Sequence, residues 1–278
     1  MSGDLDVNLR QDFDTQLRSE DRVSAIMEEP GLRAWMASPE SSVLFINGNH
    51  AASEHQPPTS FVCAKLVSTI RSEQQQQQDD TGPTGPSARP LVLALSHFCA
   101  RHKHPKSTDA GPAGMLRSLL AQLLNAWPDF DLAIIERLRN IDHTDVDDLE
   151  HIFENLIDQV PAGIVVFCIL DSITIMEDRQ AWREDAARMV KALVRLADRH
   201  HAESHCVLKL LMTSPTTSRT LYRHVPNQNV VWMPDKVPRL GPSSDYAWKH
   251  EVAPELRASS RSVSQFMAVG QGGLSESE

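Results

Sequence analysis

Five short, strongly apolar segments constrain the fold of this chain more than any other feature. The strongest is 164–170, Ile-Val-Val-Phe-Cys-Ile-Leu, which is followed directly by Asp171. The other four segments are 42–47, 91–96, 207–212 and 229–233. Strands that are apolar throughout, rather than alternating with polar residues, are typical of a sheet covered on both faces. With helix-prone stretches between them, they predict an α/β fold, a doubly wound domain with a mainly parallel five-stranded sheet.

The composition of the chain divides it into three parts. Residues 1–41 predict an acidic N-terminal helical segment, and residues 42–235 carry all five strands. Within the second part, 72–90 contains five consecutive glutamines and then a run of Asp, Thr, Gly, Pro and Ser. Such a composition cannot bury a core, so we expect a disordered insertion there. Residues 236–278 are rich in Pro, Ser, Gly and charge, and we expect a mostly disordered tail.

Helical patterns occupy the gaps between the strands. Thr59 or Ser60 is expected to cap the helix after the first strand. A leucine-rich helix over 115–124 follows the second strand, and 128–160 predicts two extra helices with ten acidic and two basic side chains. A long helix over about 179–200 then connects the third strand to the fourth.

The overall composition excludes several classes of protein. The chain has 278 residues and a formal net charge of −10, which argues against general binding to nucleic acid or to anionic membranes. No apolar run approaches the roughly 20 residues that span a bilayer, and the first residues do not resemble a signal peptide. None of the four cysteines forms a CxxC pair. We therefore expect a reducing compartment, the cytoplasm, with the nucleus left open.

Polar side chains follow three of the predicted strands at the point where each strand ends. The first ends at Asn47-Gly48, the third at Asp171 and the fourth at Thr213-Ser214. Ligands of open parallel sheets bind beyond the carboxyl ends of the strands. These residues are therefore the first candidates for a functional site.

In order and spacing, these segments resemble the STAND-type P-loop NTPase domains, NACHT and nephrocystin-like, that are abundant in filamentous fungi. Residues 43–48 resemble the Walker A strand, 165–171 the Walker B strand and 210–215 the sensor strand. Residues 114–124 are similar to the helix after the second strand of this family. The resemblance covers roughly residues 40–235 and implies the strand order 5-1-4-3-2.

The resemblance also implies a nucleotide site at the ends of the strands. Asp171 would be the candidate Mg²⁺ contact. The residues that would line this degenerate site are Gly48, Asn49, Thr59, Ser60, Asp171, Thr213 and Ser214.

The phosphate-binding loop departs from the family pattern. A working loop reads GxxxxGK[ST], in which the lysine neutralises the β- and γ-phosphates and the hydroxyl holds Mg²⁺. Counted from Gly48, the lysine position is Glu54 and the hydroxyl position is His55. If the loop is instead longer, Thr59-Ser60 lies at the helix start, and the site again has no cation. At about 4 Å each charge pair is worth roughly 1–4 kcal/mol, so both alternatives disfavour tight binding of Mg-ATP.

The acid that activates the attacking water is also missing from its usual place. After Asp171 the sequence continues Ser-Ile-Thr-Ile-Met before the next acid, Glu177. The family usually carries further acids immediately after the Walker B aspartate, so the general-base position here is empty or filled from a register that the family does not use. We therefore predict no catalytic residues.

A zinc site is a weaker alternative. The candidate ligands His97, Cys99, His102 and His104 lie within eight residues, but no second ligand pair has matching spacing. We do not expect metal at this place.

Together these features predict a catalytically degenerate domain that acts as a protein-interaction or regulatory scaffold. We expect a protein partner, for which the acidic stretch 128–160 is the candidate surface, and no tightly bound cofactor. The alternative is a signalling switch that binds ATP or ADP weakly, without fast hydrolysis, through the helix start at Thr59-Ser60 and through Asp171.

Overall fold

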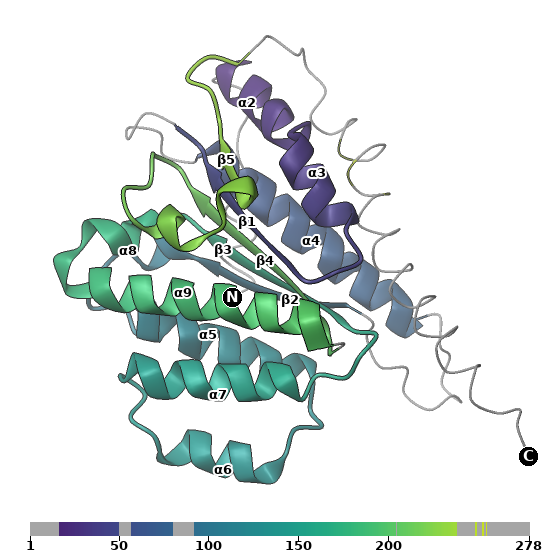
Figure 1. Cartoon of the computed structure of the whole chain (residues 1–278), viewed down its shortest axis with the longest axis vertical. Coiled ribbons are helices and arrows are strands. Elements are labelled where there is room, and N and C mark those ends of the chain that lie inside the picture. Colours follow the sequence, from purple (N-terminus) through teal and green to yellow (C-terminus); the bar gives the residue numbers. More distant parts are fainter. Residues whose placement is uncertain are drawn as a thin grey trace, which may run out of the picture.

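The computed structural model describes residues 17–49, 57–79, 92–203 and 205–237, together with Trp248, Val252 and Pro254. Five strands form one parallel sheet in the order β2-β3-β4-β1-β5 (Figure 1). This order confirms the predicted fold class. The strands are β1 Ser42–Asn47, β2 Val92–Phe98, β3 Val165–Asp171, β4 Val207–Ser214 and β5 Val230–Trp232.

The register brings the polar strand ends to the same edge of the sheet. Asn47 of β1 pairs with Ser214 of β4, and Asp171 of β3 pairs with Phe98 of β2. All seven residues of β2 and of β3 are buried, as expected for strands that are apolar on both faces. We call the edge at which the strands end the carboxyl edge, and the opposite one the amino edge.

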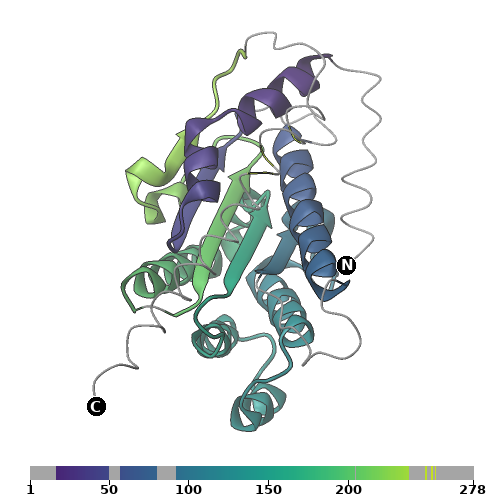
Figure 2. The ribbon, with the colours of Figure 1, turned by 90° about the vertical axis from the view of Figure 1, so that its right-hand side faces the viewer.

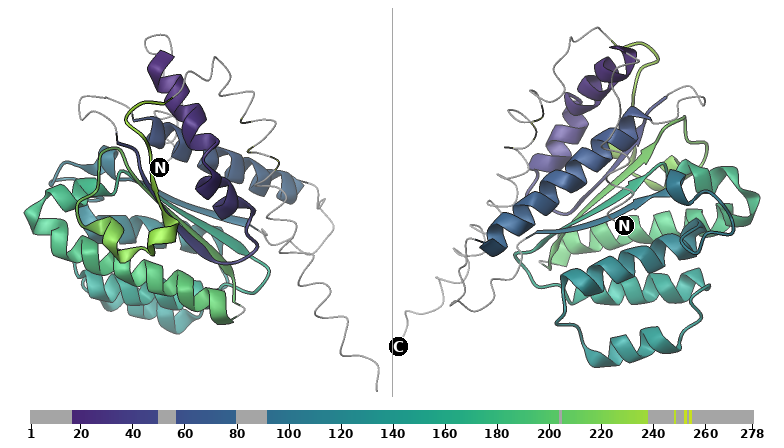
Figure 3. Two further views of the ribbon diagram at one scale, coloured as in Figure 1. Left: turned by 45° about the horizontal axis from the view of Figure 1, so that its top comes forward. Right: turned by 180° about the vertical axis from the view of Figure 1, so that it is seen from behind.

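Helices cover both faces of the sheet (Figures 2 and 3). Along β1, Leu44 and Ile46 face the first helical layer, whereas Val43 and Phe45 face the second. The first layer consists of α2 Leu17–Met27, α3 Pro30–Ala37 and α4 Pro58–Asp79. The second layer consists of α5 Gly111–Ala126, α7 Val146–Asp158, α8 Thr174–Asp178 and α9 Gln180–Glu203, with α6 Leu132–Asn140 outside α7.

Short 3-10 turns complete the described part of the chain. They are η2 Cys99–His102, η3 Leu221–His224 and η4 Asn227–Asn229. Among the described residues, no helix combines the length and apolarity that crossing a membrane would require.

The two predicted extra helices after β2 have the caps that their sequence suggests. Asp131 precedes α6 and accepts a hydrogen bond from the N–H of Ala133. Asp145 precedes α7 and accepts from the N–H of Asp147 at 2.8 Å. Aspartate at this position satisfies an otherwise unpaired helix donor and complements the helix dipole.

Helix α4 differs from the sequence expectation at both of its ends. It begins at Pro58, so Thr59 and Ser60 lie within its first turn instead of capping it. Proline is favoured at the first helical position because its missing N–H would have no partner there. At the other end, α4 continues to Asp79, so 72–79 is helical where we expected the start of a disordered insertion. Glutamine is a good helix former, which explains the continuation; the rest of that insertion lies outside the described residues.

Side-chain amides cover the backbone of β2, which is an edge strand. Gln74 of α4 donates from Nε2 to the carbonyl of Val92 at 2.5 Å. Gln122 of α5 donates to the carbonyl of Ser96 at 2.9 Å and accepts from its N–H at 3.0 Å. Because exposed strand edges promote aggregation, these contacts protect this side of the sheet.

Two residues of the predicted tail are buried against the domain. Trp248 is 4% exposed and Val252 is fully buried, and both belong to the apolar cluster that includes residues of α2 and α4. The other residues from 238 to 278, apart from Pro254, lie outside the described part of the chain.

Candidate functional site

A buried carboxylate lies at the centre of the carboxyl edge. Asp171, the last residue of β3, is 1% exposed. Its Oδ1 accepts a hydrogen bond from Thr213 Oγ1 at 2.7 Å. Its Oδ2 accepts from Ser60 Oγ at 2.7 Å and from Ser172 Oγ at 3.0 Å. We call these four residues the carboxyl-edge cluster, which joins β3, β4 and the first turn of α4.

Within the described part of the chain, three hydroxyl groups and the backbone N–H of Ser172 stabilise this carboxylate, and no cation does. Burial raises the pKa of Asp171, and the hydrogen bonds from Ser60, Thr213 and Ser172 oppose that shift. The pKa of the nearby Cys63 thiol is also raised, mainly by burial and further by the charge of Asp171. The cluster is therefore a low-dielectric site in which a carboxyl group is hydrogen-bonded but contacts no described cation.

The turn after β3 is fixed by the end of β4. Ser172 has a φ of 58°, in the left-handed region that residues with a side chain seldom adopt. Thr213 holds this turn, because its Oγ1 accepts from Ser172 N at 3.2 Å and its carbonyl accepts from Ile173 N at 2.9 Å. Ser172 is a member of the cluster that the sequence analysis missed, since its only signal was its place directly after Asp171.

Two other predicted site residues meet next to this cluster. The N–H of Gly48 donates to the carbonyl of Ser214 at 2.7 Å, which continues the pairing of β1 and β4 by one residue. The hydroxyl of Ser214 lies 2.9 Å from that of Thr174, at the start of α8. Thr174 was not predicted as a site residue.

Three buried polar atoms at this edge have no hydrogen-bond partner among the described residues. They are Oγ1 of Thr59, Nδ2 of Asn47 and Nε2 of His97, in side chains that are 1%, 0% and 3% exposed. The carbonyl oxygen of the Asn47 side chain is satisfied by the N–H of Ser218 at 2.9 Å. Unpaired buried polar groups are uncommon, and they mark a place where a ligand or water could bind.

Asn49 turns away from the cluster. Its side-chain amide donates to Asp235, and its Oδ1 accepts from Thr217 Oγ1 at 3.3 Å. Arg22 of α2 donates to the carbonyl of Gly48 at 3.3 Å and to that of Asn49 at 3.5 Å. The structure thus brings Ser60, Asp171 and Thr213 into direct contact and leaves Asn49 in a separate network. The loop positions Ser53, Glu54 and His55 lie outside the described residues.

Glu177, the first acid after Asp171, has a structural role. It is 3% exposed, and its carboxylate accepts from Ser218 Oγ at 3.0 Å, Arg219 N at 2.8 Å and Thr220 Oγ1 at 2.6 Å. The N–H of Thr220 donates to it as well. Both carboxylate oxygens of Glu177 are therefore occupied in holding the loop after β4.

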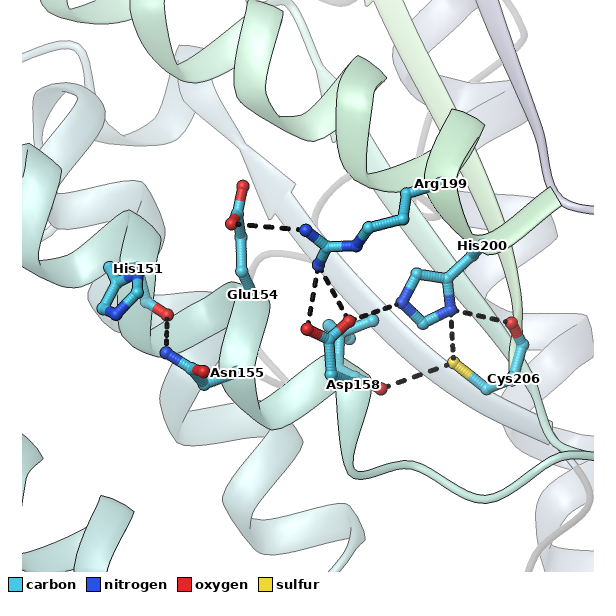
Figure 4. A network of polar contacts seen from close by, with 8 residues as sticks. His151, Glu154, Asn155, Asp158, Arg199, His200 and Cys206 are labelled. Carbon is cyan, nitrogen blue, oxygen red and sulfur yellow. Dashed lines mark hydrogen bonds and ion pairs between the residues drawn. The ribbon is translucent and has the colours of Figure 1, made fainter. Parts of the chain in front are cut away.

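A second polar network lies at the amino edge (Figure 4). His200 of α9 places Nε2 2.9 Å from Asp158 Oδ1 and Nδ1 3.1 Å from the carbonyl of Cys206. Arg199 donates to both oxygens of Asp158, at 2.8 and 2.9 Å. We call Asp158, Arg199, His200 and Cys206 the amino-edge cluster, which links the ends of α7 and α9 to the start of β4.

The amino-edge cluster contains the residue types of a Cys-His-Asp catalytic triad, but its chemistry does not fit one. Cys206 Sγ lies 3.6 Å from His200 Nδ1, yet the side chain is fully buried. Burial, and then the charge of Asp158, raise the pKa of this thiol to about 12. Because the thiolate is the nucleophile in such enzymes, a protonated and inaccessible thiol indicates a structural network.

Among the described residues, the histidines at the end of β2 and in the turn after it do not form a metal site. His97 is buried and its ring stacks on that of His102, with 4.9 Å between the centroids. Burial, and then His102, lower the pKa of His97 to about 3, so it is neutral at pH 7. Within the described ranges, no three His, Cys, Asp or Glu side chains are placed to hold a metal ion.

The fold and the carboxyl-edge cluster define an α/β domain whose polar site lies at the ends of parallel strands. A family model described as "Nephrocystin 3, N-terminal" matches residues 22–215, from within α2 to just past the end of β4. The match covers more than half of the chain, so the chain belongs to this family. A comparison with curated proteins gives no match.

Proposed function

We propose that this domain is a P-loop-like domain that has lost nucleotide hydrolysis and acts as a regulatory or protein-interaction scaffold. The observation that carries the proposal is the contact between Ser60 and Asp171, because it leaves an uncharged residue, Thr59, at the lysine position. In a working site the hydroxyl that follows the lysine lies beside the Walker B aspartate, because both hold the same Mg²⁺. Ser60 Oγ lies 2.7 Å from Asp171, which supports placing Ser60 at the hydroxyl position.

This assignment places Thr59 at the lysine position and Pro58 at the preceding glycine position. It favours the longer loop over the direct count that ended at Glu54 and His55. Thr59 carries no charge, and Pro58 has no N–H with which to bind a phosphate. The glycine and lysine positions that bind the triphosphate in the GxxxxGK[ST] pattern are therefore both changed.

The residues at the carboxyl edge do not fit Mg-ATP as a working site would. The carboxylate of Asp171 already accepts three hydroxyl hydrogen bonds, and no described cationic side chain contacts it. A missing lysine removes roughly 1–4 kcal/mol of attraction for each charge pair at about 4 Å. Glu177 is occupied by the loop after β4, so it offers no free base for an attacking water.

We propose a protein as the partner and the helical lobe 128–160 as its surface. Four ion pairs with arginines of α9 already use part of the acidic side of α7, namely Asp147–Arg188, Glu150–Arg195, Glu154–Arg199 and Asp158–Arg199. Helix α6 offers more free surface, since it lies outside α7 and has no buried residue (Figure 1). Its Leu132 is 76% exposed, which supports α6 as the centre of the contact.

The cytoplasm is our proposed location. All four cysteines are buried and free of disulfides, which supports a reducing compartment.

Phosphate release from ATP tests the loss of hydrolysis. We expect the purified chain to show no Mg²⁺-dependent turnover above a buffer control. Turnover that Asp171→Ala abolishes, in a variant whose circular dichroism shows that it is folded, would refute the proposal. Ser60→Ala is the matched second variant. It removes one of the three hydroxyl groups that contact Asp171 and leaves the carboxyl group in place.

A weak nucleotide switch is the second candidate function. The unpaired Oγ1 of Thr59 and Nδ2 of Asn47 favour it, because both lie at the edge where α4, a helix of 22 residues, begins. A helix N-terminus attracts anions through its free N–H groups and its dipole. In a thermal-shift titration, stabilisation by a few degrees with micromolar Mg-ATP or ADP favours the switch. No stabilisation up to millimolar concentration favours the scaffold.

A further inference from the structure

Two residues far beyond the family match complete the apolar layer over α2 and α4. The match ends at residue 215, whereas Trp248 and Val252 lie more than 30 residues later. They belong to the same buried cluster as Ile26 of α2 and Leu66 of α4. The layer is therefore finished by a segment that the family model does not include.

The tryptophan is anchored by a polar contact as well as by its apolar surface. Its indole Nε1–H donates to Thr69 Oγ1 of α4 at 3.0 Å. Thr69 Oγ1 in turn donates to the carbonyl of Lys65 at 2.9 Å, so this hydroxyl both accepts and donates. A buried tryptophan with a paired N–H is the kind of anchor that dominates binding at protein interfaces.

The sequence around these anchors has the pattern of a short amphipathic ligand. Trp248 and Val252 are four positions apart, the spacing that places two side chains on one face of a helix. The three residues between them, Lys249, His250 and Glu251, are all polar or charged. Segments that dock into grooves as helices present their apolar anchors at this spacing.

We propose that the α2–α4 face is a docking surface for a helical segment that carries a tryptophan and an aliphatic residue four positions later. In this chain the segment that contains Trp248 and Val252 fills the surface in cis. Its tether keeps its effective concentration high, so a competing segment binds only when the cis segment is released. The use of this surface to regulate partners rests on the scaffold function proposed above, whereas the docking itself does not.

Binding of a separate peptide tests the docking surface directly. A fluorescent peptide of residues 241–258 is titrated into the full chain that carries Trp248→Ala and Val252→Ala, with anisotropy as the readout. Because the surface is empty in this variant, we expect saturable binding. The intact chain should bind the same peptide at least ~10-fold more weakly, because its own segment competes. A peptide with alanine at the position of Trp248 should not bind.

Trp232→Ala in an otherwise intact chain is the matched control. Trp232 is 50% exposed on β5, so its loss removes a tryptophan without emptying the α2–α4 face. This variant should exclude the peptide as well as the intact chain does. No binding to the double variant up to about 1 mM peptide, or equal binding to the double variant and the intact chain, would overturn the proposal.

A second measurement covers the case in which the double variant does not fold. A protease site is inserted after Gly241 in the full chain, which is cut under native conditions and passed over a sizing column. We expect the released fragment to co-elute with the domain, and to separate from it when Trp248 is replaced by alanine. Separation without that replacement contradicts the docking. A dimer of the uncut chain that Trp248→Ala dissociates would show that a second copy is the occupant, and would overturn docking in cis. Neither result depends on nucleotide binding, so failure here leaves the proposed loss of hydrolysis untouched.

Discussion

The two edges of the sheet each contain a carboxylate, but they stabilise it in different ways. At the amino edge, Asp158 is paired with the guanidinium of Arg199 and the imidazole of His200. At the carboxyl edge, Asp171 is bonded to three hydroxyl groups. Asp158 is 38% exposed and pairs with a cation, whereas Asp171 is buried and contacts no described cation.

This difference places the proposed loss of nucleotide hydrolysis at the carboxyl edge. At the amino edge, Asp158 is paired with the guanidinium of Arg199, and this pair joins α7, α9 and β4. The domain therefore does use a cation to offset a carboxylate elsewhere in the fold. The described residues supply none to Asp171, where nucleotide chemistry would need one. The amino-edge cluster is therefore expected to contribute to stability, and the carboxyl-edge cluster to contribute much less.

Loss of His200 should have the largest effect on stability. His200→Ala removes a fully buried ring and leaves Asp158 and the carbonyl of Cys206 without its two bonds. We expect a loss of about 2–3 kcal/mol in the free energy of unfolding, measured by urea denaturation. His151→Ala on α7 is the matched control, because that side chain is exposed and should change stability by less than about 0.5 kcal/mol. Equal effects of the two substitutions would contradict the role given to the amino edge.

The next largest effect on stability should come from the titration of Lys209, which makes the free energy of unfolding depend on pH. This lysine is fully buried near the start of β4 and donates to the carbonyl of Trp35 at 2.9 Å and to Ser42 Oγ at 3.1 Å. Burial lowers its pKa to about 7, and the charge of Glu40 opposes the shift. Above that pH the unfolded chain binds a proton that the folded chain has released, so folding becomes more favourable as the pH rises.

Relative to Lys209→Met, the intact chain should therefore gain up to about 1.4 kcal/mol per pH unit above pH 7, until the pH approaches the pKa of an unfolded lysine. Urea denaturation of both chains at pH 7, 8 and 9 measures this gain. A constant difference between the two chains over this range would show that Lys209 stays protonated in the fold.

Asp171→Asn should have the smallest effect. The substitution replaces a buried carboxyl group that no described cation contacts and keeps an oxygen that accepts hydrogen bonds, so we expect a change of about 1 kcal/mol or less at pH 7. Because burial raises the pKa of Asp171, the folded chain holds this proton to a higher pH than the unfolded chain does. The stability of the intact chain relative to the variant should therefore fall as the pH rises above about 4. A loss of more than about 3 kcal/mol at pH 7 would indicate that a cation pairs with Asp171 after all.

Much of the fold could be predicted because its strands are apolar along their whole length. The predicted segment 42–47 coincides with β1, and the other four overlap the observed strands to within about two residues at each end. The end of α4 and the burial of Trp248 were missed for a physical reason. Composition reports only the average tendency of a segment. The continuation of α4 from its buried first turns, and the burial of one tryptophan in an otherwise polar segment, both depend on tertiary contacts.

The candidate site was predictable only where strand ends identify it. The contact of Ser60, Asp171 and Thr213 follows from parallel strands that end at one edge, and these three residues were among those named from the sequence. The positive φ of Ser172 and the bonds of Glu177 to 218–220 depend on how two loops pack, which strand periodicity does not report. Asp158, His200 and Cys206 are 42 and 6 residues apart in sequence, so no local motif indicates that they meet.

Calorimetric titration of Mg-ATP into the intact chain tests the central claim most directly. The neutral residue at position 59 predicts no saturable heat with a Kd below about 1 mM, and Thr59→Lys should bind more tightly than the intact chain by restoring the cation. A micromolar Kd for the intact chain that Ser60→Ala abolishes would contradict the account.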